Sequence, residues 1–267
     1  MKKGMVVLSM LLLGAQAFAA DMPAKADADK ERIRSMVKEV LREYASSLSP
    51  KHLNADAKGL MQNIGQDNRN FMRTHKAGYF KPFADGQHPR ATVITCADSR
   101  VHTHAFDASP DGDLFLVRNI GNQIATAEGS VEYGVNHLHT PVLLIVGHSA
   151  CGAIKAASGD YSGESGPIKN ELNAIQIPKG EGGIGSVVLN VHNQVKYAMG
   201  KFEQKVISGE LTIVGAVYDF RDEMKQGQGK LAIVNVNGET DPKKLAQLEV
   251  VQATEQTVAR RRSPLSQ

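Results

Sequence analysis

The chain has 267 residues, of which 42% are hydrophobic and 22% charged, the balance of an ordinary globular protein. Its 31 basic and 28 acidic side chains give a net charge of +3, and without Lys2 and Lys3 the count is 29 against 28. So small a basic surplus excludes a protein that neutralises many phosphates, so we expect no nucleic-acid partner. The composition also excludes a disordered or low-complexity chain.

Residues 1–19 have the pattern of a secretory signal peptide. Two lysines begin it, a largely apolar run over 5–13 follows, and an Ala-Phe-Ala sequence that ends at Ala19 fits the cleavage rule. The apolar run is about half of the ~20 residues needed to cross a bilayer, so an uncleaved anchor or a buried helix is the weaker interpretation. We therefore expect export to the periplasm and a mature chain, 20–267, that forms one domain with no membrane span.

Two amphipathic helices are predicted before the first strand. The pattern over 28–47 repeats apolar residues at helical spacing, with charged residues on the other face, and its apolar positions are Ile33, Met36, Val37, Val40, Leu41 and Tyr44. A second helical pattern runs through 60–72. Apolar helix faces of this kind pack on their own domain or on a partner subunit, and periodicity alone does not choose between the two.

The rest of the chain predicts an α/β fold. Short apolar runs without alternation are typical of strands covered on both faces, as in a parallel sheet, and they occupy residues 91–96, 114–117, 142–146, 211–217 and 231–236. Helical patterns over 127–139 and 184–206 lie between some of them, and 159–183 has the composition of a surface loop. We expect a mainly parallel sheet flanked by helices, in a single domain with an N-terminal helical extension.

Two of the predicted strands run directly into residues that bind metals. Cys96 ends the first run, and His148 and Cys151 follow the third. Ligands gather at the carboxyl ends of strands in open α/β sheets, and two thiolates with one imidazole form a tetrahedral zinc site that keeps one position open. The alternative is a disulfide between the two cysteines, which would leave His148, Asp98 and Arg100 unexplained.

Three motifs resemble the β-class carbonic anhydrases: Cys-Ala-Asp-Ser-Arg at 96–100, Val-Arg-Asn-Ile-Gly-Asn at 117–122 and Gly-His-Ser-Ala-Cys-Gly at 147–152. The resemblance extends from about residue 60 to 236. It implies one Zn²⁺ per subunit, bound by Cys96, His148 and Cys151. It also implies reversible hydration of carbon dioxide to bicarbonate and a proton by zinc-bound hydroxide, in a homodimer or a larger homo-oligomer.

The same resemblance assigns further residues. Asp98 and Arg100 would form the catalytic dyad, in which Arg100 holds Asp98 away from the metal; a simple local ion pair is the alternative. Gln87, nine residues before Cys96, and Gly152 would contact the substrate, and an ordinary loop amide is the alternative for Gln87.

Two other functions stay open at this stage. One is a related zinc hydrolase that acts on CS2 or COS with the same site behind a restricted entrance, and parallel assays would distinguish it. The other is an exported protein without enzymatic activity, in which the two cysteines form a disulfide. Thiol titration and metal analysis would distinguish that protein from an enzyme.

Overall fold

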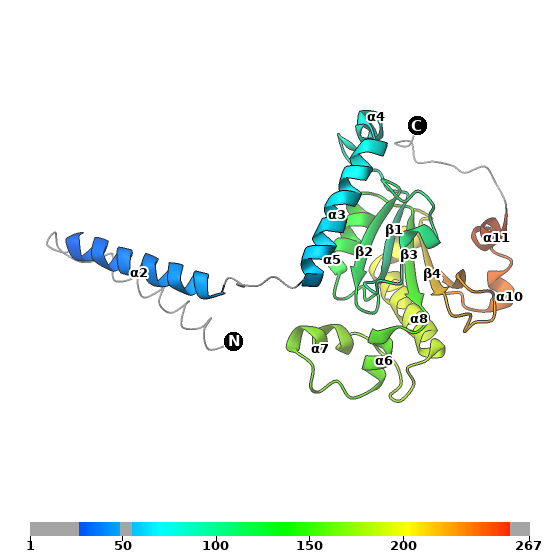
Figure 1. Ribbon diagram of the computed structural model, residues 1–267. Helices are drawn as coiled ribbons and strands as arrows, with labels where there is room; N and C mark the ends of the chain where they lie inside the picture. The colour runs from blue at the N-terminus through cyan, green and yellow to red at the C-terminus, as the bar shows by residue number, and fades with distance from the viewer. Residues whose placement is uncertain (1–26, 49–54, 257–267) are drawn as a thin grey trace. The chain divides into compact units, whose positions relative to one another are not determined.

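The computed structural model describes residues 27–48 and 55–256, and the chain divides into two compact units (Figure 1). The first unit ends at His75 and the second begins at Lys76. The predicted signal peptide lies outside the described residues.

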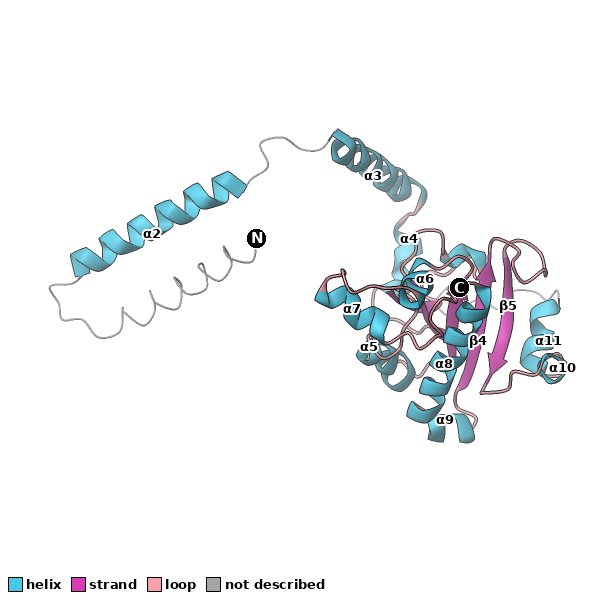
Figure 2. Ribbon diagram, turned by 90° about the horizontal axis from the view of Figure 1, so that it is seen from below, coloured by secondary structure: helices cyan, strands magenta, loops and turns pink. Residues whose placement is uncertain are grey.

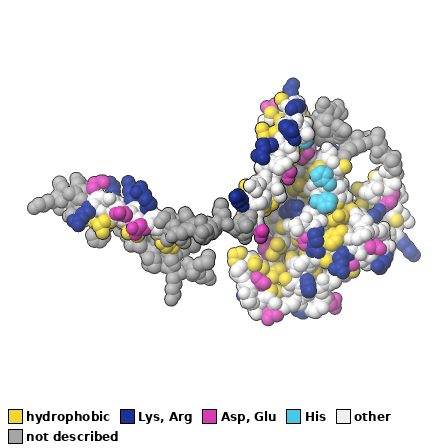
Figure 3. Space-filling view, in the orientation of Figure 1, with side chains coloured by type: hydrophobic (Ala, Val, Ile, Leu, Met, Phe, Trp, Pro, Cys, Tyr) yellow, Lys and Arg dark blue, Asp and Glu magenta, His cyan; other side chains and the backbone are white. Residues whose placement is uncertain are grey.

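The first unit consists of the helices α2 (Asp27–Leu48) and α3 (Ala55–Thr74), which confirms both helical patterns. Their apolar residues are exposed: Val40 is 62% accessible and Met72 is 62% accessible. Figure 3 shows apolar side chains at the surface of both helices. Among the described residues, no helix combines the length and the apolar character that crossing a bilayer requires.

The second unit is built on a five-stranded sheet in the order β2-β1-β3-β4-β5. Its strands are β1 (Ala91–Cys96), β2 (Leu114–Asn119), β3 (Val142–His148), β4 (Thr212–Asp219) and β5 (Lys230–Val236). The first four strands are parallel and only β5 runs antiparallel to its neighbour. The predicted mainly parallel sheet is therefore confirmed, and all five apolar runs form strands.

The helices of the second unit are α4 (Ala77–Phe80), α5 (Glu128–Glu132), α6 (Gly152–Ser158), α7 (Gly166–Asn173), α8 (Ile184–Lys201), α9 (Glu203–Ile207), α10 (Pro242–Leu245) and α11 (Glu249–Glu255). Short 3-10 turns occupy Lys81–Phe83 and Thr103–Ala105, and α5 continues into a π-helical turn, Tyr133–His137. The pattern expected over 184–206 divides into α8 and α9 at Phe202, whose buried ring anchors the break.

The buried valine side chains along one face of α8 cover the centre of the sheet. The helix lies against β3, β4 and β5, and Figure 2 shows it alongside β4. Two strand glycines allow this close approach: a Cβ at Gly147 would stand 2.8 Å from Val191, and one at Gly215 would stand 2.7 Å from the same side chain. This close packing holds β3 and β4 firmly against α8, and it therefore fixes the position of the strand ends that carry the candidate site.

The expectation of a surface loop over 159–183 is wrong in part. This segment contains α7, and Leu172 and Ile175 are buried in the main hydrophobic cluster of the second unit. The many glycine, serine and charged residues dominate the composition, but two apolar side chains suffice to attach the segment to the core.

Candidate metal centre

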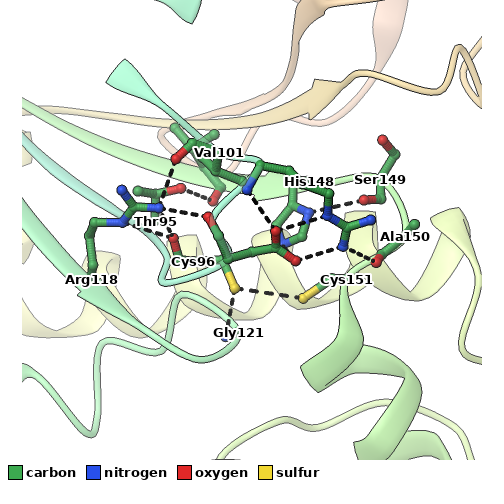
Figure 4. Close-up of polar contacts among 12 residues, drawn as sticks. Thr95, Cys96, Val101, Arg118, Gly121, His148, Ser149, Ala150 and Cys151 are labelled. Carbon is green, nitrogen blue, oxygen red and sulfur yellow. Dashed lines mark hydrogen bonds and ion pairs between the residues drawn. The ribbon is translucent and has the colours of Figure 1, made fainter. Parts of the chain in front are cut away.

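The ends of two neighbouring strands bring three metal-binding side chains together. Cys96 is the last residue of β1 and His148 is the last residue of β3, and the two strands pair in parallel, so both ends lie at the same edge of the sheet. Cys151 follows β3 after a tight turn in which Ala150 has a φ of 53°. Figure 4 shows the three side chains converging.

The three donors form a compact buried group. Their ligand atoms all lie within 4.8 Å of one another, and each of the three residues is buried. The sulfur atoms of Cys96 and Cys151 are 4.0 Å apart and both cysteines are free. This separation contradicts the alternative of a disulfide, whose sulfur atoms would be about 2.05 Å apart.

The hydrogen bonds of His148 leave one of its ring nitrogens for a metal. Nδ1 lies 3.0 Å from the carbonyl oxygen of Ser149, so the proton resides on Nδ1 and that nitrogen donates. Nε2 is fully buried and has no hydrogen-bond partner among the residues that the structure describes. A buried lone pair without a donor is costly, and a metal ion among the two sulfur atoms would satisfy it.

The surroundings of Cys96 favour its thiolate form. The contact with Cys151 lowers the pKa of Cys96 well below its ordinary value, and the backbone N–H of Gly121, which donates to the sulfur over 3.4 Å, acts in the same direction. The same contact and burial raise the pKa of Cys151. The pair therefore favours a thiolate on Cys96, and a bound cation would favour the thiolate form of both sulfur atoms.

Buried amides hold the loop that presents Gly121. Gln123 and Asn190 both donate to the carbonyl oxygen of Gly121, and Gln194 on α8 donates to Gln123 over 2.9 Å. Gly121 itself has a φ of +81°, and a Cβ there would stand 2.8 Å from Ile175. Only glycine fits this position, and the amide network aims its N–H at Cys96.

Asp98 and Arg100 form the ion pair that the sequence predicts. The Nε of Arg100 donates to Asp98 over 2.9 Å and one terminal nitrogen donates over 2.6 Å, so the pair is bidentate. These bonds hold the pKa of Asp98 well below its usual range, so Asp98 remains a carboxylate. One carboxylate oxygen of Asp98 lies 3.9 Å from Nε2 of His148, which places the pair beside the metal donors.

Arg118 fixes the loop that follows Cys96. Its guanidinium donates to the carbonyl oxygen atoms of Cys96, Asp98 and Val101, over 2.8 Å, 2.9 Å and 2.8 Å respectively. The loop therefore has a defined shape before any ligand binds, as Figure 4 shows.

The two predicted substrate contacts differ in their positions. Gly152 directly follows Cys151, and a Cβ there would meet nothing within 4 Å, so open space adjoins the donors at that point. Gln87 is exposed and precedes β1, whereas Cys96 ends it. Six strand residues separate the two ends by roughly 17 Å, since each step advances ~3.3 Å. Within one chain, the structure does not bring Gln87 to the donors.

A pocket of about 300 Å³ adjoins the donors and is lined in part by Ala150, Cys151, Lys155 and Arg221. It gives small molecules access to the side of the site formed by the turn after β3. Sequence reasoning missed several residues that shape the site: Gly121, Gln123 and Ser149 act through backbone or amide groups, and Phe220 lies over Arg100. Gly121 and Ser149 lie within the 117–122 and 147–152 motifs, whereas Gln123 and Phe220 lie outside the three motifs.

Comparison with known proteins agrees with this geometry. A family model described as carbonic anhydrase matches residues 91–228. Carbonic anhydrase 2 of Mycobacterium tuberculosis is 32% identical over 162 residues, which cover 55% of this chain and 76% of that protein. Beta carbonic anhydrase 5 of Arabidopsis thaliana, a chloroplastic protein, is 30% identical over 168 residues, which cover 54% of this chain and 56% of that protein.

Solved structures share the fold. One of two tetrameric β-carbonic anhydrases from the filamentous ascomycete Sordaria macrospora superposes with a TM-score of 0.54, over 68% of this chain and 98% of that one. The two chains are 24% identical. The arrangement of sheet and helices is therefore one that β-carbonic anhydrases adopt.

Proposed function

This chain belongs to the β-class carbonic anhydrase family, and from that premise we propose that it is a zinc enzyme that reversibly hydrates carbon dioxide to bicarbonate and a proton. One observation carries the proposal: Cys96, His148 and Cys151 present three buried donors within 4.8 Å of one another, and within the described residues the Nε2 of His148 forms no hydrogen bond.

The donor set fits zinc by its chemistry. Two thiolates and one imidazole are the ligands of catalytic zinc sites that keep a fourth position open. Cys96, His148 and Cys151 would hold one ion per subunit, and the two thiolates would balance its charge. When bound, zinc supplies a Lewis acid that makes water nucleophilic near neutral pH.

Asp98 would orient the nucleophile. An ionised carboxylate only accepts hydrogen bonds, and both oxygen atoms of Asp98 already receive bonds from Arg100. The oxygen 3.9 Å from Nε2 of His148 lies beside the donor group and can accept a further hydrogen bond. A proton-bearing nucleophile that donates to this oxygen turns its own lone pair toward carbon dioxide in the space beside Gly152.

Gln87 supports a proposal about assembly. Gln87 precedes the amino end of β1, whereas Cys96 is at the other end of that strand, so contact with substrate at the site of a second subunit is the arrangement that we propose. The exposed apolar residues of α2 and α3 agree with burial against another copy of the chain. We therefore propose a homodimer or larger homo-oligomer in which Gln87 of one subunit completes the site of another; sedimentation that gives only a monomer, with full activity, would contradict it.

The N-terminal pattern supports export to the periplasm. We propose that the segment 1–19 is removed during export and that the enzyme acts there as the chain 20–267, a single domain with a helical extension. The test is N-terminal sequencing of protein from fractionated Gram-negative cells, where a mature start at Ala20 in the periplasmic fraction is expected. Protein that retains Met1 in the cytoplasmic fraction would overturn this proposal.

The test of the function combines metal content with activity. Purified protein should contain about one zinc per chain and hydrate carbon dioxide in a stopped-flow assay. Parallel assays with COS and CS2 test the alternative function. His148→Ala should lose zinc and activity together, because two thiolates alone do not complete the site. His192→Ala is the matched control, since this half-buried histidine lies on α8. A metal-free variant with full activity would refute the function.

A further inference from the structure

Phe220 places an aromatic ring over the predicted dyad. It is the first residue after β4 and is half-buried. The guanidinium carbon of Arg100 lies 5.0 Å from the centre of its ring. The imidazole of His148 is stacked near the same ring, with centroids 6.0 Å apart and planes 23° apart. Phe220 therefore contacts both a metal donor and the charged partner of Asp98.

The backbone around Phe220 fixes the position of this ring. The buried carboxylate of Asp219 accepts hydrogen bonds from the N–H groups of Arg221 and Met224, over 3.2 Å and 2.7 Å. The amide of Gln228 donates to the carbonyl oxygen of Phe220 over 2.9 Å. The turn after β4 is thus closed on itself, and the ring lies in a defined place before Arg100 packs against it.

Arg100 needs such a support because its side chain is 50% exposed. A long side chain at the surface has many rotamers, and an exposed ion pair alone holds it weakly. A cation over an aromatic face gains a further attraction, and the ring also covers one side of the guanidinium from water. Besides its two bonds to Asp98, the guanidinium of Arg100 donates to the carbonyl oxygen of Ala150 over 3.1 Å. These bonds leave the face of the guanidinium to the ring of Phe220.

The position of Arg100 decides what Asp98 can reach. One oxygen of Asp98 is 2.6 Å from Arg100 and 3.9 Å from Nε2 of His148, so the same atom faces both the guanidinium and the donor group. A carboxylate oxygen is itself a good zinc ligand. If Arg100 moves away, Asp98 is free to turn toward the metal.

We propose that Phe220 is a positioning residue, which holds Arg100 against Asp98 and thereby keeps the Asp98 carboxylate turned from the metal donors. The proposal rests on the proposed function of the site. It assigns the effect to the aromatic face rather than to bulk, so an aliphatic side chain of similar size does not replace Phe220, whereas tyrosine does.

The experiment compares Phe220→Leu and Phe220→Tyr with a matched control, Phe106→Leu. Phe106 is also half-buried and packs against the same small hydrophobic cluster as Phe220. Zinc-loaded proteins are assayed for carbon dioxide hydration. Cobalt-substituted proteins are examined by visible absorption, which responds to a change of ligand at the metal, and urea unfolding measures the stability of all variants.

Phe220→Leu should lower kcat/KM about three- to tenfold, the size expected for a lost cation–π contact at a partly exposed site, and should shift the cobalt spectrum. Phe220→Tyr and Phe106→Leu should keep the activity and spectrum of the wild type, although Phe106→Leu lowers stability. The proposal is overturned if Phe220→Leu changes neither kcat/KM nor the cobalt spectrum. It is also overturned if Phe220→Tyr or Phe106→Leu changes both of these as much as Phe220→Leu does.

The two proposals fail separately in this experiment. A wild-type protein that binds zinc but does not hydrate carbon dioxide refutes the proposed function. The cobalt spectra of the variants still decide whether Phe220 controls the position of Asp98, because they report the ligands of the metal and not the reaction.

Discussion

The carboxyl edge of the sheet and the N-terminal helices show two different uses of apolar residues. At the sheet edge, the three donors are buried, the backbone N–H of Gly121 donates to Cys96, and the carbonyl oxygen of Ser149 accepts from His148. In α2 and α3, many apolar residues of the same kinds are exposed, among them Val40 and Met72. Periodicity predicts helices and strands in both regions equally well, but it does not say which surface covers an apolar face. In the second unit the structure shows that surface, and for α2 and α3 we have proposed that another copy of the chain supplies it.

Removal of the Asp98 carboxylate tests the chemical role of the sheet edge. Asp98→Ala should retain zinc, because the three donors are unchanged, yet lose about 10²- to 10³-fold in kcat/KM, the range for a misplaced proton acceptor. Metal analysis and a hydration assay on the same preparation separate the two effects. Loss of zinc in this variant would mean that Asp98 is structural, and Asp160→Ala, a change at a surface acid, is the control.

The amide network tests whether the rigidity of the sheet edge matters for the metal. Gln123→Leu removes the bond to the Gly121 carbonyl and frees the loop whose N–H donates to Cys96. Zinc affinity should fall about tenfold, the lower end of the range for groups that orient a ligand. Competition with a chromophoric chelator measures it. Gln204→Leu, at an exposed position on α9, should leave the affinity unchanged, and equal affinities for the two variants would contradict the role of the network.

Two valines compare the regions directly. Val191 on α8 is 0% accessible and Val40 on α2 is 62% accessible. Val191→Ala should lower the free energy of unfolding by about 2 kcal/mol at every protein concentration, because it leaves a cavity under the sheet, whereas Val40→Ala should change it by less than ~0.5 kcal/mol where the chain is monomeric. Urea unfolding at several protein concentrations measures both. A loss for Val40→Ala that appears at high concentration and vanishes on dilution would identify α2 as part of a subunit interface.

Acidification is expected to have the smallest of these effects, and it acts on the free energy of unfolding. The pKa of Asp98 is lowered in the folded chain by its hydrogen bonds with Arg100. A carboxyl group of this kind stabilises the fold above its unfolded pKa of about 3.9, and the contribution is lost as the pH falls toward the folded value. The difference in unfolding free energy between the wild type and Asp98→Asn should stay constant above about pH 5 and shrink below about pH 4. A difference that grows on acidification would contradict the ion pair.

Much of the site could be predicted from the sequence because it depends on a rule of topology. Cys96 and His148 end adjacent parallel strands, and strand ends of that kind meet at one edge wherever the fold is open α/β. The spacing of Cys151 from His148 then needs only a turn. The helices α2, α3 and α8 follow from apolar periodicity, although α8 ends at Lys201 because Phe202 is drawn into the core.

The sequence by itself therefore determined the five strands, the helices α2, α3 and α8, and the three donors, since these depend on apolar patterns or on a position at a strand end. The Asp98–Arg100 pair followed from the resemblance to the family. Only the tertiary structure decided the rest. Gly121 and Gln123, in the loop after β2, and Phe220, after β4, reach the site through a backbone N–H, an amide and a ring, and no local pattern records which distant group such atoms meet. The separation of Gln87 from Cys96 was also decided by the structure and not by a local pattern, because β1 lies between them and its length and direction set the separation.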